Sequence, residues 1–124
     1  MSEESPFSEL GVRRHLRDAE KTLVEQLLQR AHPRATFSGN LDDVEVQEMS
    51  DGGMGSLRFV PTKSIESRRF GVLVAELLFN DSDGVAILAS LFVDKEGDLY
   101  ELDILKVDFS PTISLAGAIQ PNQK

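Results

Sequence analysis

Two acidic residues near the end of the chain have the types and spacing for acid–base chemistry. Glu101 and Asp103 lie two positions apart in the apolar run 99–107, so in a strand they share one face. On a partly apolar face, the pKa of a carboxyl group can rise enough for the group to act as a general acid or base. Solvent-facing acids paired with a base such as Arg58 or Lys106 are the commoner arrangement. We therefore predict a binding role for Arg58, Glu101 and Asp103, and no catalytic residue.

Two aspartate-rich turns, 80–84 and 94–98, offer oxygen ligands without completing a metal site. A calcium loop aligned on Gly84 would place Phe79 at the first ligand position and Ser90 at the twelfth, where a bidentate Glu is required. The two histidines are not spaced as a helical ligand pair, and the chain has no Cys. We therefore predict hairpin turns, with no metal and no other cofactor.

The charge balance argues against nucleic acid and membrane partners. Thirteen basic residues stand against twenty-one acidic ones, which leaves a net charge of −8. That charge repels phosphate backbones and anionic lipid, although Arg13, Arg14 and Arg17 form one cationic cluster. The acidic N-terminus does not resemble a signal peptide, and no apolar run approaches the roughly 20 residues that span a bilayer. With no Cys, the composition suits the cytoplasm.

One amphipathic helix precedes the predicted strands. Apolar residues at positions 23, 24, 27, 28 and 31 form one stripe, and polar side chains cover the other side. Asp18 is the expected N-cap, and Pro33 should end the helix near Ala31. Residues 1–12 are expected to be a flexible lead-in, residues 13–115 a single domain and residues 116–124 a C-terminal tail.

About five strands follow the helix, at 41–49, 56–60, 70–79, 85–94 and 98–108. The first pair forms a hairpin through the glycine-rich turn 51–55, and the last pair forms another through 94–98. Residues 70–79 are continuously apolar, which fits a buried strand or a buried helix; Gly71 and the Val and Phe residues favour a strand. In the last strand, the row Tyr100, Leu102, Ile104 should face the core.

These elements predict an α+β fold in two layers, with the N-terminal helix packed on a curved antiparallel meander, similar in shape to cystatin-like folds. The strand 85–94 is apolar on both faces, and one helix covers only one face of a sheet. The other face is expected to meet a second subunit, a partner or the C-terminal tail.

Three stretches together resemble an uncharacterised family of small bacterial proteins with a domain of unknown function. They are residues 13–21, the Asp-Gly-Gly-Met-Gly-Ser-Leu-Arg-Phe run at 51–59, and residues 101–111, which end in Lys-Val-Asp-Phe-Ser-Pro. The resemblance spans roughly residues 13 to 115. It implies a single-domain bacterial protein of the cytoplasm and supplies no catalytic residue.

Two hypotheses of function follow. The first is a non-enzymatic interaction protein that uses an apolar sheet face, either as a homodimer or with a basic protein partner, as an immunity-type inhibitor of a basic toxin would. The alternative is a small enzyme or ligand-binding protein with a pocket between helix and sheet, lined by Arg58, Glu101 and Asp103.

Overall fold

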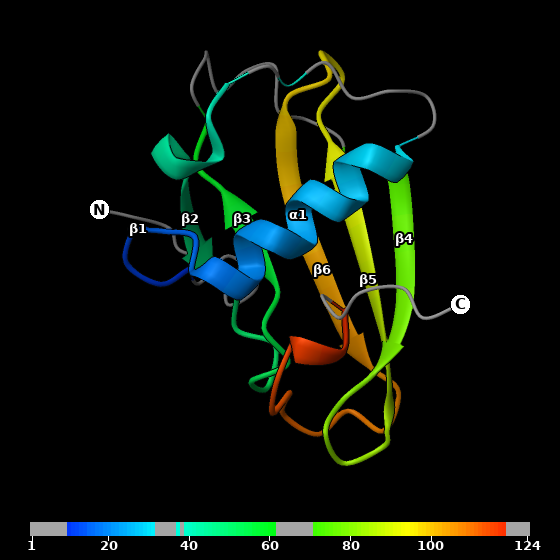
Figure 1. The fold of residues 1–124 in the computed structure, drawn as a ribbon. Coiled ribbons are helices and arrows are strands. Elements are labelled where there is room, and N and C mark those ends of the chain that lie inside the picture. The colour runs from blue at the N-terminus through cyan, green and yellow to red at the C-terminus, as the bar shows by residue number, and fades with distance from the viewer. Residues whose placement is uncertain (1–9, 32–36, 38, 62–70, 119–124) are drawn as a thin grey trace.

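The computed structural model describes residues 10–31, 37, 39–61 and 71–118, which form one helix layer on one sheet layer (Figure 1). This confirms the predicted two-layer α+β fold, with six antiparallel strands instead of about five. The elements are β1 (Arg14–His15), α1 (Asp18–Arg30), the 3-10 helix η2 (Leu41–Asp43), β2 (Glu45–Glu48), β3 (Leu57–Phe59), β4 (Val72–Asn80), β5 (Ala86–Val93), β6 (Leu99–Lys106) and the 3-10 helix η4 (Ala116–Ala118).

The sheet is not the simple meander that we predicted. Its strand order is β1-β2-β3-β6-β5-β4, so β6 pairs with β3 while β4 lies at the far edge. Local patterns define each hairpin, but the position of β6 beside β3 depends on long-range packing of their apolar rows. Both predicted hairpins, β2–β3 and β5–β6, are present, and the strand predicted at 70–79 is observed as the edge strand β4, Val72–Asn80; residue 70 lies outside the described residues.

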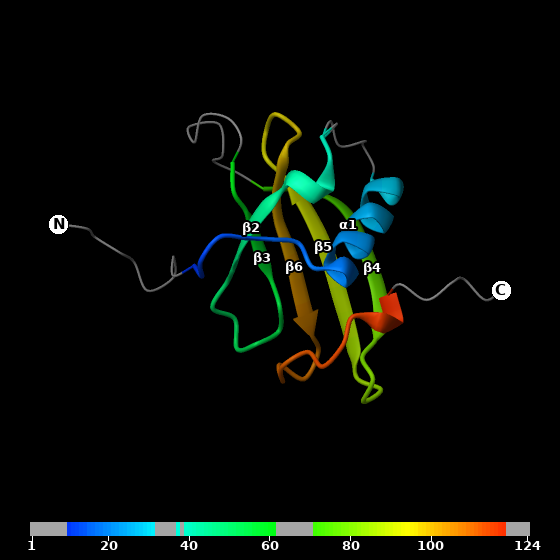
Figure 2. The same cartoon turned by 60° about the vertical axis from the view of Figure 1, so that its left-hand side comes forward.

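The core lies between α1 and the sheet (Figures 1 and 2). Leu23, Val24 and Leu27 of the predicted stripe are fully buried, and each Leu buried in this way contributes roughly 1.5–3 kcal/mol. The facing side chains of β5 and β6 are Ile87, Ala89, Leu91, Leu102 and Ile104. The helix begins one residue earlier than expected, because Arg17 occupies the N-cap and Asp18 is the first helical residue.

Strand β1 was not predicted. Arg14 pairs with Val46 and His15 with Glu45, so the cationic lead into the helix adds a short strand to the edge of β2. Two polar residues are too few to show a period, which is why the sequence pattern misses this strand. Likewise, Leu41–Asp43 forms a 3-10 turn where a strand was expected.

A register shift between β5 and β6 changes which side chains face the core. Phe92 pairs with Glu101 whereas Val93 pairs with Leu99, so Tyr100 is an extra residue on β6. Leu102 and Ile104 face the core as predicted, but Leu99 is also buried instead of sharing the row of Glu101. The predicted core position of Tyr100 is wrong for the same reason.

The C-terminal segment does not cover the second sheet face over the residues described. Leu115 and Ala118 pack against the core cluster on the helix side, and Gly117 lies against Asn80 at the end of β4. Residues 116–118 therefore lie at the edge of the sheet beside β4, and not over its second face. The face opposite α1 carries the side chains of the alternate rows of β4, β5 and β6.

Candidate functional site

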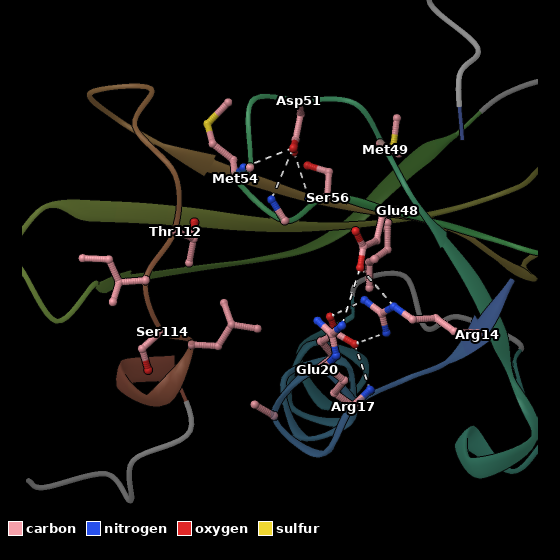
Figure 3. Close-up of a pocket in the computed structure, with 16 residues that line it drawn as sticks. Arg14, Arg17, Glu20, Glu48, Met49, Asp51, Met54, Ser56, Thr112 and Ser114 are labelled. Atoms are coloured by element: carbon pink, nitrogen blue, oxygen red, sulfur yellow. Dashed lines mark hydrogen bonds and ion pairs between the residues drawn. The ribbon is translucent and has the colours of Figure 1, made fainter. Parts of the chain in front are cut away.

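A pocket of about 400 Å³ lies between the first turn of α1, the β2–β3 turn and residues 112–115 (Figure 3). Its charged side chains are Arg14, Arg17, Glu20, Glu48 and Asp51, and Asp51 lies with Ser56 on the side of the β2–β3 turn. Two of the three stretches that carry the family resemblance, 13–21 and 51–59, contribute to its lining.

The β2–β3 turn is held by the side chain of Asp51. Its Oδ1 accepts from the backbone N–H of Met54 at 3.1 Å and of Gly55 at 3.4 Å, and its Oδ2 accepts from Ser56 N at 2.9 Å. Gly53 has φ +85°, and a Cβ there would lie 3.2 Å from Pro111. The glycine-rich motif is therefore a close-packed turn that contacts the Ser-Pro end of the third stretch.

The opposite wall, residues 112–115, is fixed by a buried ion cluster. Lys106 Nζ donates to Asp81 Oδ2 at 2.9 Å, to Asp83 Oδ2 at 2.7 Å and to the Pro111 carbonyl at 3.2 Å. Asp81 also accepts from the backbone N–H groups of Ile113 and Ser114 at 2.8 and 3.0 Å. All three ammonium protons have acceptors, so Lys106 positions the wall and is not available to a ligand.

These contacts shift the pKa values of the cluster. Burial opposes ionisation of Asp81, but hydrogen bonds from Ile113 N and the Lys106 ammonium hold the pKa of its carboxyl well below the ordinary value. The hydrogen bond to Asp83 raises the pKa of Lys106 and, in the same contact, lowers that of Asp83. The cluster is therefore charged at neutral pH and carries no group prepared for proton transfer.

A second ion-pair group lies on the helix side of the pocket. Arg14 Nη1 and Nη2 each donate to Glu20 at 2.9 Å, and Glu20 also accepts from Arg17 N at 2.8 Å (Figure 3). Burial of Glu20 opposes its ionisation, yet the bidentate Arg14 contact lowers the pKa of Glu20; the same hydrogen bond raises the pKa of Arg14. Arg14 Nε contacts Glu48 Oε2 at 3.2 Å, and Arg17 contacts the same oxygen at 3.7 Å.

The residues predicted for binding lie elsewhere. Arg58 Nη2 donates to Glu101 Oε1 at 3.1 Å, and the guanidinium lies over the ring of Tyr100, 4.8 Å from its centroid. Asp103 accepts from the Ser56 hydroxyl at 3.2 Å. The expected pairing of Glu101 with Arg58 is thus observed, whereas Lys106 faces the core and pairs with the aspartates of the β4–β5 turn.

The position expected for these three residues in the alternative hypothesis is wrong. Arg58, Glu101 and Asp103 alternate with buried core residues, so they lie on the sheet face opposite α1 and not between helix and sheet. The pocket on the helix side is lined by different side chains. The sequence pattern singled out Arg14 and Arg17 as part of a cationic cluster, but neither Glu20 nor Glu48 was identified as a partner; the Arg17-x-x-Glu20 spacing is the one local signal for the Glu20 contact.

Two further findings concern metal ligands and membrane-spanning helices. Among residues 10–31, 37, 39–61 and 71–118, no group of three or more His, Cys, Asp or Glu side chains is placed to hold a metal ion. No helix in that part of the chain has the length and apolar character to cross a membrane.

The fold and the pocket define a small two-layer α+β domain with a pocket whose charged side chains form ion pairs with one another. The model of a family described as a domain of unknown function (DUF6984) matches residues 13–116, and the chain belongs to this family. No curated protein and no solved structure matches the chain.

Proposed function

We propose that this chain is a non-enzymatic protein-binding domain that uses the sheet face opposite α1, called here the open face. The observation that carries this proposal is a row of leucines, Leu78, Leu88 and Leu105, in register across β4, β5 and β6. Leu78 is 66% exposed, whereas Leu88 and Leu105 are half-buried. A contiguous apolar row that reaches the surface in this way is typical of interaction surfaces.

The charges of the open face favour a partner with basic side chains. Glu76 and Asp103 lie in the row next to the leucines, and Glu101 lies one row further along the same face. Arg58 is the one basic residue among the described residues of these rows. A second copy stacked on this face would bring acid onto acid, which costs free energy. A different, basic protein is therefore the preferred partner, and a homodimer through the leucine row is the second candidate.

The net charge of −8 supports the same partner, because it steers a basic protein toward this domain. An inhibitor of a basic toxin is one form that such a domain takes. The family resemblance and the absence of Cys support a bacterial cytoplasmic setting for it.

A photo-crosslinking experiment tests this proposal. A benzophenone side chain at position 78, on the open face, is compared with one at position 12, before β1, where Val12 is also highly exposed. In cells of the source organism we expect a discrete adduct from position 78 only, with a mass that identifies another protein. Adding Leu105→Lys should remove the adduct, because it places a cation in the leucine row, whereas Val12→Lys should not.

Three outcomes are informative. An adduct of twice the chain mass would identify the homodimer instead of a basic partner. Equal adducts from positions 78 and 12, or none from position 78, would contradict the open face as the binding surface.

A further inference from the structure

Two arginine side chains at the pocket of Figure 3 converge on one carboxylate oxygen. Glu48 Oε2 contacts both Arg14 Nε and Arg17 Nη2, and Figure 3 shows Arg14 between Glu48 and Glu20. We propose that the pocket binds a small organic monocarboxylate whose carboxylate replaces that of Glu48 between the arginines, with its apolar body inside the pocket. This site is independent of the proposed function, because it lies on the helix side of the sheet.

Glu48 is held loosely in this position. Its contacts to Arg14 and Arg17 are 3.2 and 3.7 Å long, whereas both Arg14–Glu20 hydrogen bonds measure 2.9 Å. Charge-assisted hydrogen bonds normally span about 2.7–2.9 Å, so the arginines have room for a closer partner. The Glu48 side chain is 55% exposed, and exposed ion pairs contribute little stability. Rotating Glu48 into solvent is therefore a small cost.

The two arginines differ in a way that suits ligand exchange. Arg14 is fixed by its bidentate contact with Glu20 and by a 2.9 Å hydrogen bond to the His15 carbonyl. Arg17 is 68% exposed, and Glu48 is its one ion-pair partner within the described part of the chain. Arg14 thus provides a preorganised donor, while Arg17 can close on an incoming carboxylate.

The pocket itself selects the size and charge of the ligand. A volume of about 400 Å³ is at the small end of ligand pockets. Ala19, Leu57 and Leu115 supply apolar lining, which suits an aliphatic or aromatic body. Exchange of one carboxylate for another keeps the local charge constant, whereas a dianion would add charge beside Glu20 and Asp51. The chemistry therefore favours monocarboxylates over phosphate esters.

An NMR titration of the full-length protein tests this inference with phenylacetate and hexanoate as probes. Phenylacetamide and hexanamide have the same bodies without the charge. We expect saturable shifts of the backbone amides of Met54, Gly55, Ser114 and Leu115 with a carboxylate. The matching amides should give no saturable shift at the same concentrations.

Two substitutions should act with opposite signs. Arg17→Gln should weaken binding about tenfold through loss of a charge-assisted hydrogen bond. Glu48→Gln should tighten binding, because the internal competitor loses its charge. Arg30→Gln and Glu25→Gln make the same charge changes at exposed positions of α1 outside the pocket and should leave the affinity unchanged within about twofold.

The inference would be overturned by any of three results: no saturable shift with either carboxylate, equal shifts with the amides, or equal effects of Glu48→Gln and Glu25→Gln. The last result would mean that net charge alone governs the interaction.

Discussion

Lys106 is the residue on which the arrangement around the pocket most depends. It is fully buried in a strand whose inward row is otherwise apolar. Asp81 and Asp83 compensate its charge, and the Pro111 carbonyl accepts its remaining hydrogen bond. A buried ion pair adds little net stability relative to apolar residues, but removing one partner leaves an uncompensated buried charge. Lys106 therefore links residues 101–111, the third stretch that carries the family resemblance, to the β4–β5 turn.

Lys106→Met should lower the free energy of unfolding by about 3–5 kcal/mol, because the Asp81 carboxylate remains buried without its cation. Urea denaturation measures this change. Lys95→Met removes a lysine from the exposed β5–β6 turn and should stay within about 0.5 kcal/mol of the parent. Equal effects of the two substitutions would contradict the structural role of the cluster.

Acid should weaken the fold through Asp81. The pKa of its carboxyl is lowered in the folded state, so its contribution is present in full above the ordinary aspartate pKa of about 3.9 and is lost as the pH falls toward the folded value. The free energy of unfolding, measured with urea from pH 7 downward, should therefore decline below about pH 4. Asp81→Asn should show a shallower decline; an identical slope would mean that other groups control acid unfolding.

Among the elements, the segment that contains η4 is held without strand pairing. Asp81 accepts from Ile113 N and Ser114 N, and Gly117 approaches the end of β4 so closely that a Cβ there would clash with the Asn80 carbonyl oxygen. The close approach explains why glycine occupies position 117. The wall of the pocket thus depends on the Asp81 side chain in the β4–β5 turn and on a glycine, which has no side chain, at position 117.

Gly117→Ala should displace η4 from β4 and lower the free energy of unfolding by about 1–3 kcal/mol, the usual cost of overpacking. Hydrogen exchange should show faster exchange of the Ala118 amide, which donates to Leu115 O at 3.0 Å. Gly11→Ala is the matched control, because a Cβ there meets only ordinary contacts at 3.5 Å or more. Unchanged protection of Ala118 in Gly117→Ala would contradict the close contact.

The whole molecule presents two surfaces of different character. The open face is apolar and acidic, while the helix side carries the pocket with its paired arginines and glutamates. The sheet separates them, and substitutions at distant sites without shared partners act additively.

We therefore place the crosslinker at position 105 and substitute Leu78→Lys. This substitution should remove the crosslinked adduct of the open face and leave phenylacetate binding unchanged. Arg17→Gln should weaken phenylacetate binding and leave the adduct intact. The two readouts are the NMR titration and the crosslinking yield. If either substitution changed both readouts, the two surfaces would be coupled through the sheet.

Local patterns in the sequence determined the helix, both hairpins and strand β4. The stripe through Leu23 and Leu27 and the left-handed Gly97 of the β5–β6 turn (φ +90°) depend on residues that are close in the sequence. The bulge at Tyr100 was missed, because a strict alternation cannot indicate an extra residue.

Only the tertiary structure decided where these elements meet. Strand β6 lies beside β3, Lys106 reaches aspartates more than twenty positions earlier, and Arg14 meets Glu48 from a strand that follows the helix. Such contacts join residues that lie far apart in the sequence, and no local spacing indicates which partner each will meet. Their partners are selected by burial, since a charge taken from water must find its counterion in the folded chain. The sequence by itself therefore established the layers, and the packing of those layers created the pocket and the open face.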